Sequence, residues 1–452
     1  MKQKLSGWGR TAWSYSDVIT PSSIQEISAV VASPQPRGVI ARGLGRSYGA
    51  ASQNAGGTVI DMAHYASSSG IELDQQTGVV TAGAGVSIDA LLKYCVPRGW
   101  FIPVTPGTRF VTIGGAIGSD IHGKNHHVDG SFGVHVLSMR VMLSTTEIIN
   151  LSPLEKPDWF WATIAGMGLT GLVVDATFQM LAISSSLMSV ETERLQNFDA
   201  LIEAMGSADD DNRYRYSVAW VDLLASGASL GRGVLSRGEH ASSNQDSRQE
   251  CLAYKPKVRM SAPPWVPNGV INKLSIKAFN EAWYRKAPPK RKESLESIAG
   301  FFHPLDGVRQ WNRLYGTQGF IQYQFIVPLD QTDVLRGVIG RFADAGVASF
   351  LAVLKRMGKS NPAPMSFPDT GWTLTLDIAA GARGLPELLS TVDSVVLDAG
   401  GRHYLAKDAH VSPRAVQVGY AHLEEWKQIR NEMDPTGVWK SDLGRRLGLV
   451  DP

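Results

Sequence analysis

Cysteine is nearly absent from this sequence, with only Cys95 and Cys251 in 452 residues. Two cysteines so far apart are too few for a disulfide framework or a metal knuckle. The formal net charge of +2 gives no argument for a nucleic-acid partner. No uninterrupted apolar run is long enough to span a bilayer, and the basic start Met1–Trp8 lacks the apolar core of a conventional signal peptide. We therefore expect a protein that is made and folded in the cytoplasm.

The chain is long enough for two or more domains and a large core. Hydrophobic residues make up 43% and charged residues 19%, as in ordinary globular proteins. Short strand and helix candidates alternate in the first part, which indicates an α+β domain. Three of these are a helix capped by Thr20 with Pro21 in its first turn, a Ser87-capped helix over residues 88–96, and a strand over residues 101–104. Residues 237–304, rich in Ser, Pro, Lys and Arg, predict a long irregular tract.

Glycine is concentrated in the segment Pro106–His127. A packed helix or strand avoids glycine, because glycine loses the most conformational freedom on folding. The simplest use of such a segment is a backbone that approaches a ligand closely and offers N–H groups to phosphate oxygens. Ile113, Ile117 and Ile121 recur at four-residue spacing, which predicts a short helical turn packed on a core, with its start free to meet an anion. The alternative is an ordinary surface connector.

A second glycine cluster, Arg42–Gly49, follows the apolar strand candidate Val39–Ala41. It resembles the dinucleotide-binding turn of Rossmann folds only superficially, because Tyr48 stands where the third glycine belongs and no regular apolar helix follows. Two such clusters, each after a strand candidate, indicate a nucleotide-like ligand more strongly than either one alone.

Several segments together resemble the vanillyl-alcohol-oxidase flavoprotein superfamily. They are Arg42–Gly49, Pro106–His127, Gly166–Gly171 and Asp434–Trp439 with Ser441 and Asp442. Within that superfamily the sequence is most similar to the decaprenylphosphoryl-β-D-ribose 2-oxidase family. The segments specific to it are Asp120–His127, Trp311–Arg313 with Tyr315 and Gly316, Gln322–Phe325 and Ala406–Asp408. The similarity runs from Trp8 almost to the C-terminus.

This resemblance implies an α+β, two-domain FAD-binding fold of the PCMH/VAO type, with a substrate cap domain built on an antiparallel sheet. We expect an FAD-binding domain over residues 1–183 and a cap domain with mobile loops over residues 184–405. Residues 406–452 are expected to return to the FAD domain.

FAD is the cofactor that the resemblance implies. Gly43, Gly45, Gly114 and Gly115 would let N–H groups reach its pyrophosphate. Many members of the superfamily bind FAD covalently through a histidine in the first loop, where this chain has Arg46, so we predict a non-covalent flavin. The family usually has aspartate where this chain has Ala50, which weakens one polar contact. The expected cofactor-binding residues are Ala41, Arg42, Gly43, Leu44, Gly45, Arg46, Ser47, Tyr48, Gly49, Ala50, Ala51, Gly107, Thr112, Ile113, Gly114, Gly115, Ser119, Asp120, Ile121, His122, Val173 and Tyr404.

The expected catalytic residues are Lys407, Tyr315 and His122. Lys407 would stabilise developing negative charge or, if desolvated, act as a base; the alternative is a surface lysine paired with Asp408. No metal is expected, because no acidic residue is placed to complete a zinc site with the adjacent His126 and His127. The expected substrate-pocket residues are Trp220, Gln322, Gln324, Lys355 and Thr375, the last standing where the mycobacterial pattern has cysteine.

The implied reaction is FAD-dependent oxidation of the 2-hydroxyl of a polyprenyl-phosphate ribose, such as decaprenylphosphoryl-β-D-ribose, to the 2-keto sugar. A short-chain reductase partner would complete the epimerisation to the arabinose donor for cell-wall arabinan. The basic and aromatic run Trp283–Lys292 is either a solvated loop or a contact to an anionic membrane. The family suggests peripheral association with the inner membrane, on its periplasmic face. The alternatives are a soluble alditol or aldonolactone oxidase that uses oxygen, and a non-catalytic flavin-binding scaffold.

Overall fold

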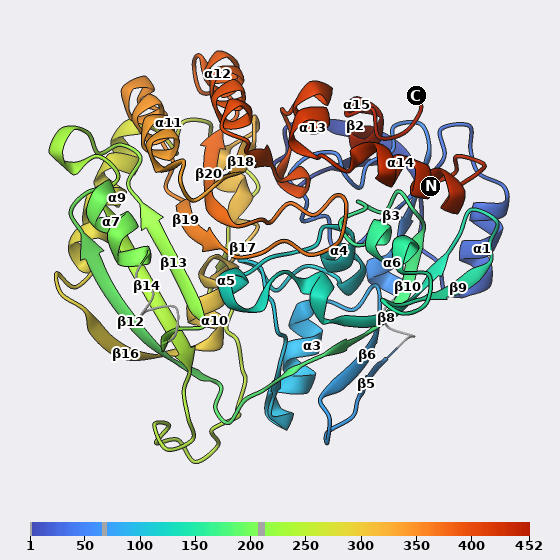
Figure 1. The fold of residues 1–452 in the computed structure, drawn as a ribbon, viewed down its shortest axis with the longest axis horizontal. Coiled ribbons are helices and arrows are strands. Elements are labelled where there is room, and N and C mark those ends of the chain that lie inside the picture. Colours follow the sequence, from blue (N-terminus) through green and yellow to red (C-terminus); the bar gives the residue numbers. More distant parts are fainter. Residues whose placement is uncertain (1, 66–69, 207–212) are drawn as a thin grey trace.

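The computed structural model describes residues 2–65, 70–206 and 213–452, and three sheets organise it (Figure 1). The first is a mixed four-stranded sheet, and the second is a five-stranded antiparallel sheet. In spatial order the first holds β1 (Lys2–Ser6), β2 (Trp13–Ile19), β4 (Thr58–Asp61) and β3 (Val39–Arg42). The second holds β5 (Ile71–Leu73), β6 (Val79–Gly83), β10 (Leu172–Gln179), β8 (Val136–Met142) and β9 (Ile148–Leu151).

The third sheet is antiparallel throughout and has eight strands. In spatial order they are β16 (Lys292–Ser297), β12 (Leu187–Leu195), β14 (Gly233–His240), β13 (Tyr216–Val221), β19 (Ala352–Met357), β20 (Gly371–Ala379), β18 (Phe320–Val327) and β21 (Arg402–His403). Two short pairs complete the strands: β7 (Trp100–Phe101) with β11 (Leu181–Ala182), and β15 (Met260–Ser261) with β17 (Val308–Arg309).

Helices cover one face of the eight-stranded sheet. Phe198 and Leu201 of α7 (Phe198–Met205), Leu335 of α11 (Thr332–Ala345) and Leu389 of α12 (Leu385–Asp398) share one apolar cluster with the inward-facing residues of β13, β18, β19 and β20. Because side chains alternate across a strand, the opposite face of this sheet carries a separate set of residues. That opposite face turns toward the rest of the molecule.

The C-terminal helices pack against the four-stranded sheet. Trp426 and Leu443 lie in one cluster with Val18, Ile40 and Val59. Both termini accordingly lie in the half of the molecule away from the eight-stranded sheet (Figure 1). The helices of this segment are α13 (Pro413–Gly419), α14 (Leu423–Met433) and α15 (Asp442–Arg446). The boundaries proposed at residues 183/184 and 405/406 stay a prediction, although the strands of the eight-stranded sheet all fall between them.

The first half also carries short helices. The α3 helix starts after Ser87 as predicted, and the Ser87 hydroxyl accepts a hydrogen bond from the Ala90 N–H. The α4 helix buries Ile113 and Ile117 in the core, with Ile121 just after it, as their spacing predicts. These helices are α1 (Ile24–Ala32), α2 (Met62–Tyr65), α3 (Ile88–Cys95), α4 (Ile113–Gly118), α5 (His126–Asp129) and α6 (Pro157–Thr163).

Three local predictions are wrong. Thr20 does not cap the first helix: α1 begins at Ile24, and the extended residue Ser23 caps it by accepting from the Glu26 N–H. Residues 237–304 are not irregular throughout, because they contain α9 (Lys273–Lys286), β16 and α10 (Ile298–Phe302). The α9 helix was not predicted because it buries only Ile276 and Asn280, so its apolar residues show little helical periodicity. The strand expected over residues 101–104 is also shorter, ending at Phe101.

Candidate active site

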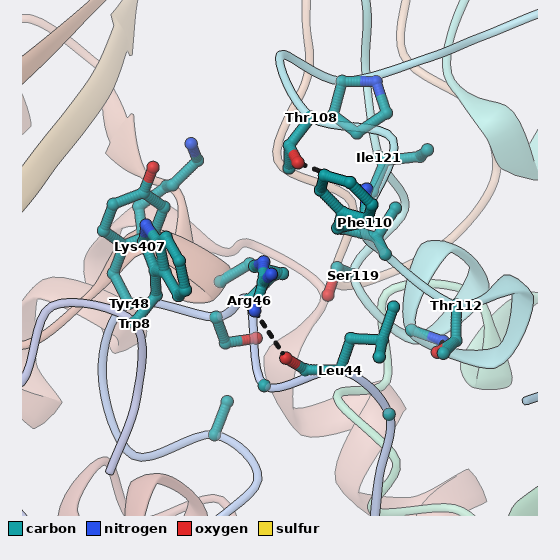
Figure 2. A pocket seen from close by; sticks show the side chains of 18 of the residues that line it. Trp8, Leu44, Arg46, Tyr48, Thr108, Phe110, Thr112, Ser119, Ile121 and Lys407 are labelled. Carbon is teal, nitrogen blue, oxygen red and sulfur yellow. Dashed lines mark hydrogen bonds between the residues drawn. The ribbon is translucent and has the colours of Figure 1, made fainter. Parts of the chain in front are cut away.

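A cavity of about 540 Å³ separates the two glycine-rich loops from the polar face of the eight-stranded sheet. The loop after β3 and the segment around α4 form one side, and β18, β19, β20 and the Leu405–Lys407 turn form the other. Figure 2 shows part of this cavity: Lys407, Tyr48 and Trp8 lie together at one end, Thr112 and Ile121 at the other, and Arg46 between them. Most residues expected to bind cofactor or substrate therefore line a single space.

The first glycine loop presents unpaired backbone donors. Within the described residues, the N–H groups of residues 43–47 donate to no protein acceptor. Gly45 has φ +62°, a conformation that favours glycine. A Cβ on Gly43 would lie 2.2 Å from the Thr112 hydroxyl, so the close approach of the two loops requires glycine there. Consecutive free N–H groups of this kind form a nest for phosphate oxygens, which fits the pyrophosphate of FAD.

The second glycine loop has a different role from the predicted one. The N–H groups of Ile113 and Gly114 donate to the carbonyl oxygens of Val86 and Ala84, at 2.9 and 2.8 Å. The Gly115 N–H donates to the hydroxyl of Thr112, the N-cap of α4. These donors are already satisfied within the protein, so the expectation that Gly114 and Gly115 offer them to the pyrophosphate is wrong. Their lack of side chains still matters, because both residues line the cavity and keep it open there.

Arg46 is the residue that the family resemblance matches to the position of covalent flavin attachment. Its guanidinium lies 4.0 Å from the Trp8 ring centroid and 5.8 Å from that of Phe110, and it donates to the Leu44 carbonyl oxygen at 2.9 Å (Figure 2). A guanidinium held in this way forms no covalent bond to a flavin. The geometry therefore supports a non-covalently bound cofactor.

Strand alternation builds the opposite wall. Gln322 and Gln324 on β18 point away from the apolar cluster that contains Tyr323 and Phe325. In the same way, Lys355 on β19 and Thr375 on β20 face the cavity while their neighbours face the helices. The register pairs Gln324 with Thr375 and Lys355 with Thr373. Four of the five predicted substrate residues thus form one polar surface.

Lys407 reaches this surface from the turn after β21. Its ammonium nitrogen contacts the side-chain oxygen of Gln322 and lies 4.6 Å from the centroid of the Tyr48 ring. Burial lowers the pKa of Lys407 to about 8, against the opposing effect of the Asp377 carboxylate. Asp408, the alternative partner, instead pairs with Arg446. The surface-lysine alternative therefore does not describe Lys407.

His122 is bonded to the same surface. The Gln324 amide lies 2.9 Å from the Nε2 atom of His122 and donates to it, while the Nδ1 atom is buried without a partner among the described residues. Burial and the nearby Lys355 hold the pKa of His122 well below its usual value, so the ring is neutral. Burial and the charge of Lys407 also lower the pKa of Lys355, to about 7.

Some predicted residues lie outside the cavity lining. Tyr315 stacks on Phe320 with 4.3 Å between ring centroids, and the Trp220 indole donates to the Phe350 carbonyl oxygen. Asp120 instead supports the loop, since its carboxylate accepts from Gly133, Asn361 and Ser366. The other predicted residues that do not line the cavity are Gly49, Ala50 and Ile113.

Sequence reasoning also missed important residues. Asp377 is fully buried, accepts a hydrogen bond from Gln322, and keeps its Oδ2 atom without a partner among the described residues. Burial raises the pKa of Asp377 to about 7. The alternation of residues 373, 375 and 377 could have placed it on the face of Gln322. Seven further residues that line the cavity were given no role in the site from the sequence. One is Trp8, near the N-terminus, and the others lie between residues 305 and 311: Leu305, Asp306, Val308, Arg309, Gln310 and Trp311.

Over residues 2–65, 70–206 and 213–452, there is no group of three or more His, Cys, Asp or Glu side chains arranged to hold a metal ion. Nor does any helix in those ranges have the length and apolar character needed to cross a membrane.

Comparisons with known proteins match both ends of the chain to flavoenzyme families. Residues 16–152 match the FAD binding domain family, and residues 383–447 match the D-arabinono-1,4-lactone oxidase family. The first match confirms the prediction of FAD and, with the sheets described above, the α+β flavoprotein fold.

Individual relatives extend this similarity over the whole chain. Decaprenylphosphoryl-β-D-ribose oxidase of Mycolicibacterium smegmatis is 41% identical over 99% of this chain and 98% of its own length. An uncharacterised protein of Streptomyces coelicolor is 36% identical over 80% of this chain and all of its own length. D-2-hydroxyglutarate dehydrogenase of Escherichia coli is 33% identical over 22% of this chain and 10% of its own length.

Proposed function

The chain belongs to the family of decaprenylphosphoryl-β-D-ribose oxidases, which are FAD-dependent oxidoreductases, and we propose that it oxidises the 2-hydroxyl of a polyprenyl-phosphate ribose to a ketone. The observation that carries the proposal is the position of Lys407. It contacts Gln322 on the polar sheet face, in the same cavity that residues 43–47 line with their unpaired N–H groups.

The reaction requires two transfers from the sugar. The hydrogen on C2 leaves as hydride and the hydroxyl proton leaves to a base, so that a C=O bond replaces the C–H and O–H bonds. When bound, FAD supplies the hydride acceptor. We assign the base to Lys407, whose pKa of about 8 leaves part of the amine neutral near pH 7.

Gln322 and Asp377 position that amine. The Gln322 oxygen holds the Lys407 nitrogen, and its amide nitrogen is fixed by the Asp377 carboxylate. His122, Gln324, Lys355 and Thr375 supply the remaining polar groups of the same wall, and we assign them to binding the sugar hydroxyls. Tyr315, proposed as catalytic from the sequence, instead stacks on Phe320, the first residue of β18, and we assign it to supporting that strand.

The alternatives gain less support. The match to the D-arabinono-1,4-lactone oxidase family covers only residues 383–447, whereas the similarity to the ribose oxidase covers nearly the whole chain. A non-catalytic scaffold would not need a lysine of lowered pKa in the cavity that also holds the cofactor loops.

We further propose a peripheral membrane contact and a reductase partner. The α9 helix exposes Leu274, Phe279 and Trp283 at 80%, 42% and 44%, beside lysines and arginines of the same helix. Such a surface suits the headgroup region of an anionic membrane, where a polyprenyl-phosphate substrate resides. The ketone product of the proposed reaction must then be reduced to complete an epimerisation, which is the role of a short-chain reductase.

An anaerobic titration tests the proposed oxidation. Purified protein with bound FAD is mixed with a polyprenyl-phosphate ribose, and the flavin absorbance is followed. We expect bleaching with the lipid-linked ribose and none with soluble alditols or aldonolactones. Bleaching by soluble polyols alone would favour the oxygen-using oxidase, and no bleaching by any of these compounds would favour the scaffold.

A further inference from the structure

A second, much smaller space lies on the other side of Lys407. It measures about 10 Å³, room for a single water molecule, and is lined by Gln322, Tyr323, His403, Lys407, Asp408 and His410. Lys407 and Gln322 line both this space and the main cavity. Lys407 therefore borders both the substrate space and this small chamber.

A cluster of titratable side chains adjoins this small chamber. The Tyr323 hydroxyl donates to the Asp393 carboxylate at 2.6 Å, and His403 Nε2 lies 3.0 Å from the same oxygen. His403 is only 2% exposed, and its Nδ1 atom has no hydrogen-bond partner among the described residues. Because Nε2 faces the carboxylate, Nε2 carries the proton and Nδ1 is left as an unused acceptor.

The cluster continues to the protein surface. His410 Nε2 lies 3.7 Å from the second oxygen of Asp393, and the His410 side chain is 27% exposed. Although burial raises the pKa of Asp393, the hydrogen bonds and charges of His403, Tyr323 and His410 together outweigh it and hold that pKa below its ordinary value. Burial keeps Tyr323 protonated, with a pKa well above its usual value. Asp408 also faces this region, but its charge is matched by Arg446.

We propose that the small chamber is the proton exit of the oxidation, carrying the hydroxyl proton from Lys407 through one water to His403, Asp393 and His410. The inference rests on the proposed function, in which Lys407 takes that proton. The Lys407 ammonium gives a proton to the water as the water gives one to His403 Nδ1. The Nε2 proton of His403 then passes to Asp393 and onward through His410 to solvent, and Lys407 returns to the neutral amine.

Such a path is needed because a bound substrate would cover the side of Lys407 that lines the main cavity. A sugar and FAD held together in the main cavity would separate Lys407 from solvent on that side. Asp377 cannot take over this role by direct contact, since it reaches Lys407 only through the Gln322 amide. Within the described residues, the small chamber is the route that joins Lys407 to the partly exposed side chain of His410.

The test uses the FAD-loaded enzyme in repeated turnover with the lipid-linked ribose and a soluble electron acceptor, because Lys407 must lose its proton before each new turnover. We expect His410→Ala and Asp393→Asn each to slow steady-state turnover by about 10-fold to 100-fold, while the first flavin reduction keeps the unaltered rate. Added imidazole should restore the rate of His410→Ala, because a small base can enter the space left at the surface. FAD content and melting temperature should stay those of the unaltered enzyme.

His422→Ala is the matched control, because His422 is an exposed histidine that also contacts a carboxylate, that of Glu425. It should turn over at the unaltered rate, with or without imidazole. Unaltered turnover rates in both test variants, or a loss in His410→Ala that imidazole leaves unchanged, would overturn the proton exit. Failure of the unaltered enzyme to be reduced by the sugar would instead overturn the proposed function, so the two failures are distinct.

Discussion

Lys407 and Asp377 bond to the two ends of one side-chain amide, that of Gln322. Gln322 accepts from the ammonium at its oxygen and donates to the carboxylate from its nitrogen. A buried amine and a buried carboxylate are thereby held apart at a fixed separation, and each retains a pKa close to neutrality, about 8 for Lys407 and about 7 for Asp377. This relationship places a group that can exchange a proton at the edge of the substrate cavity.

Replacing Lys407 should abolish oxidation without removing the cofactor. Lys407→Met keeps most of the side-chain volume but provides no base and no cation. We expect flavin reduction by the lipid-linked ribose to slow by about 10²–10⁴-fold, the usual worth of a general base. FAD content should not change, because the unpaired N–H groups that face the cofactor belong to residues 43–47. Stopped-flow absorbance and released-flavin assays measure the two quantities.

The matched control is Lys359→Met, the same substitution at an exposed lysine. It should behave as the unaltered enzyme. Near-normal reduction by Lys407→Met would make Lys407 structural and return attention to His122. Loss of FAD from that variant would contradict the separation of cofactor-binding from catalytic residues.

The rate of flavin reduction should rise with pH through about 8. Burial lowers the pKa of Lys407, so its neutral and basic form grows over this interval and saturates above it. Lys355 and Asp377, both with a pKa of about 7, titrate below this step. The Lys407→Met variant should lose the step near pH 8. A rate that falls through that pH would mean that Lys407 acts as a cation instead of a base.

The sequence predicted which residues line the site better than it predicted the hydrogen bonds between them. Periodicity placed α4 and the polar face of β18, because Ile113, Ile117 and the two glutamines repeat with the period of their elements. It could not show that the N–H groups of the α4 start are already bonded to Ala84 and Val86, since those contacts join segments about 30 residues apart.

Distant contacts explain the other differences as well. Asp377 is matched to Gln322 only through the register of β18 against β20, and no local pattern specifies that register. The α9 helix was missed because its polar, mostly exposed face carries little apolar period. Its capping box at Asn272 and Ser275 was the available local signal.

The flavin should leave the protein on denaturation. The family resemblance matches Arg46 to the position where a covalent attachment would need a histidine, and its guanidinium is held over the Trp8 ring. Precipitation with acid should therefore release all the FAD into the supernatant, as measured by its absorbance. Yellow colour retained in the washed pellet would refute a non-covalent cofactor.

The α9 surface should bind anionic vesicles in a salt-dependent manner. Exposed charges are screened over about 8 Å at physiological ionic strength, so sedimentation with phosphatidylglycerol vesicles should weaken as salt is added. Trp283→Ser should weaken it further, since Trp283 is an exposed apolar residue of that helix. Trp13→Ser, which changes a similarly exposed tryptophan on β2, is the control and should bind normally. Equal binding by the two variants would argue against α9 as the contact.

Isotopic substitution of the sugar tests the proposed reaction most directly. A polyprenyl-phosphate ribose carrying deuterium at C2 is compared with one carrying it at C3, in single anaerobic turnovers monitored by flavin absorbance. If the enzyme oxidises the 2-hydroxyl, the C2-labelled sugar must bleach the flavin more slowly than the unlabelled one, while the C3-labelled sugar bleaches it at the unlabelled rate. A slowing confined to the C3 label, or no bleaching by either sugar, would contradict the assignment.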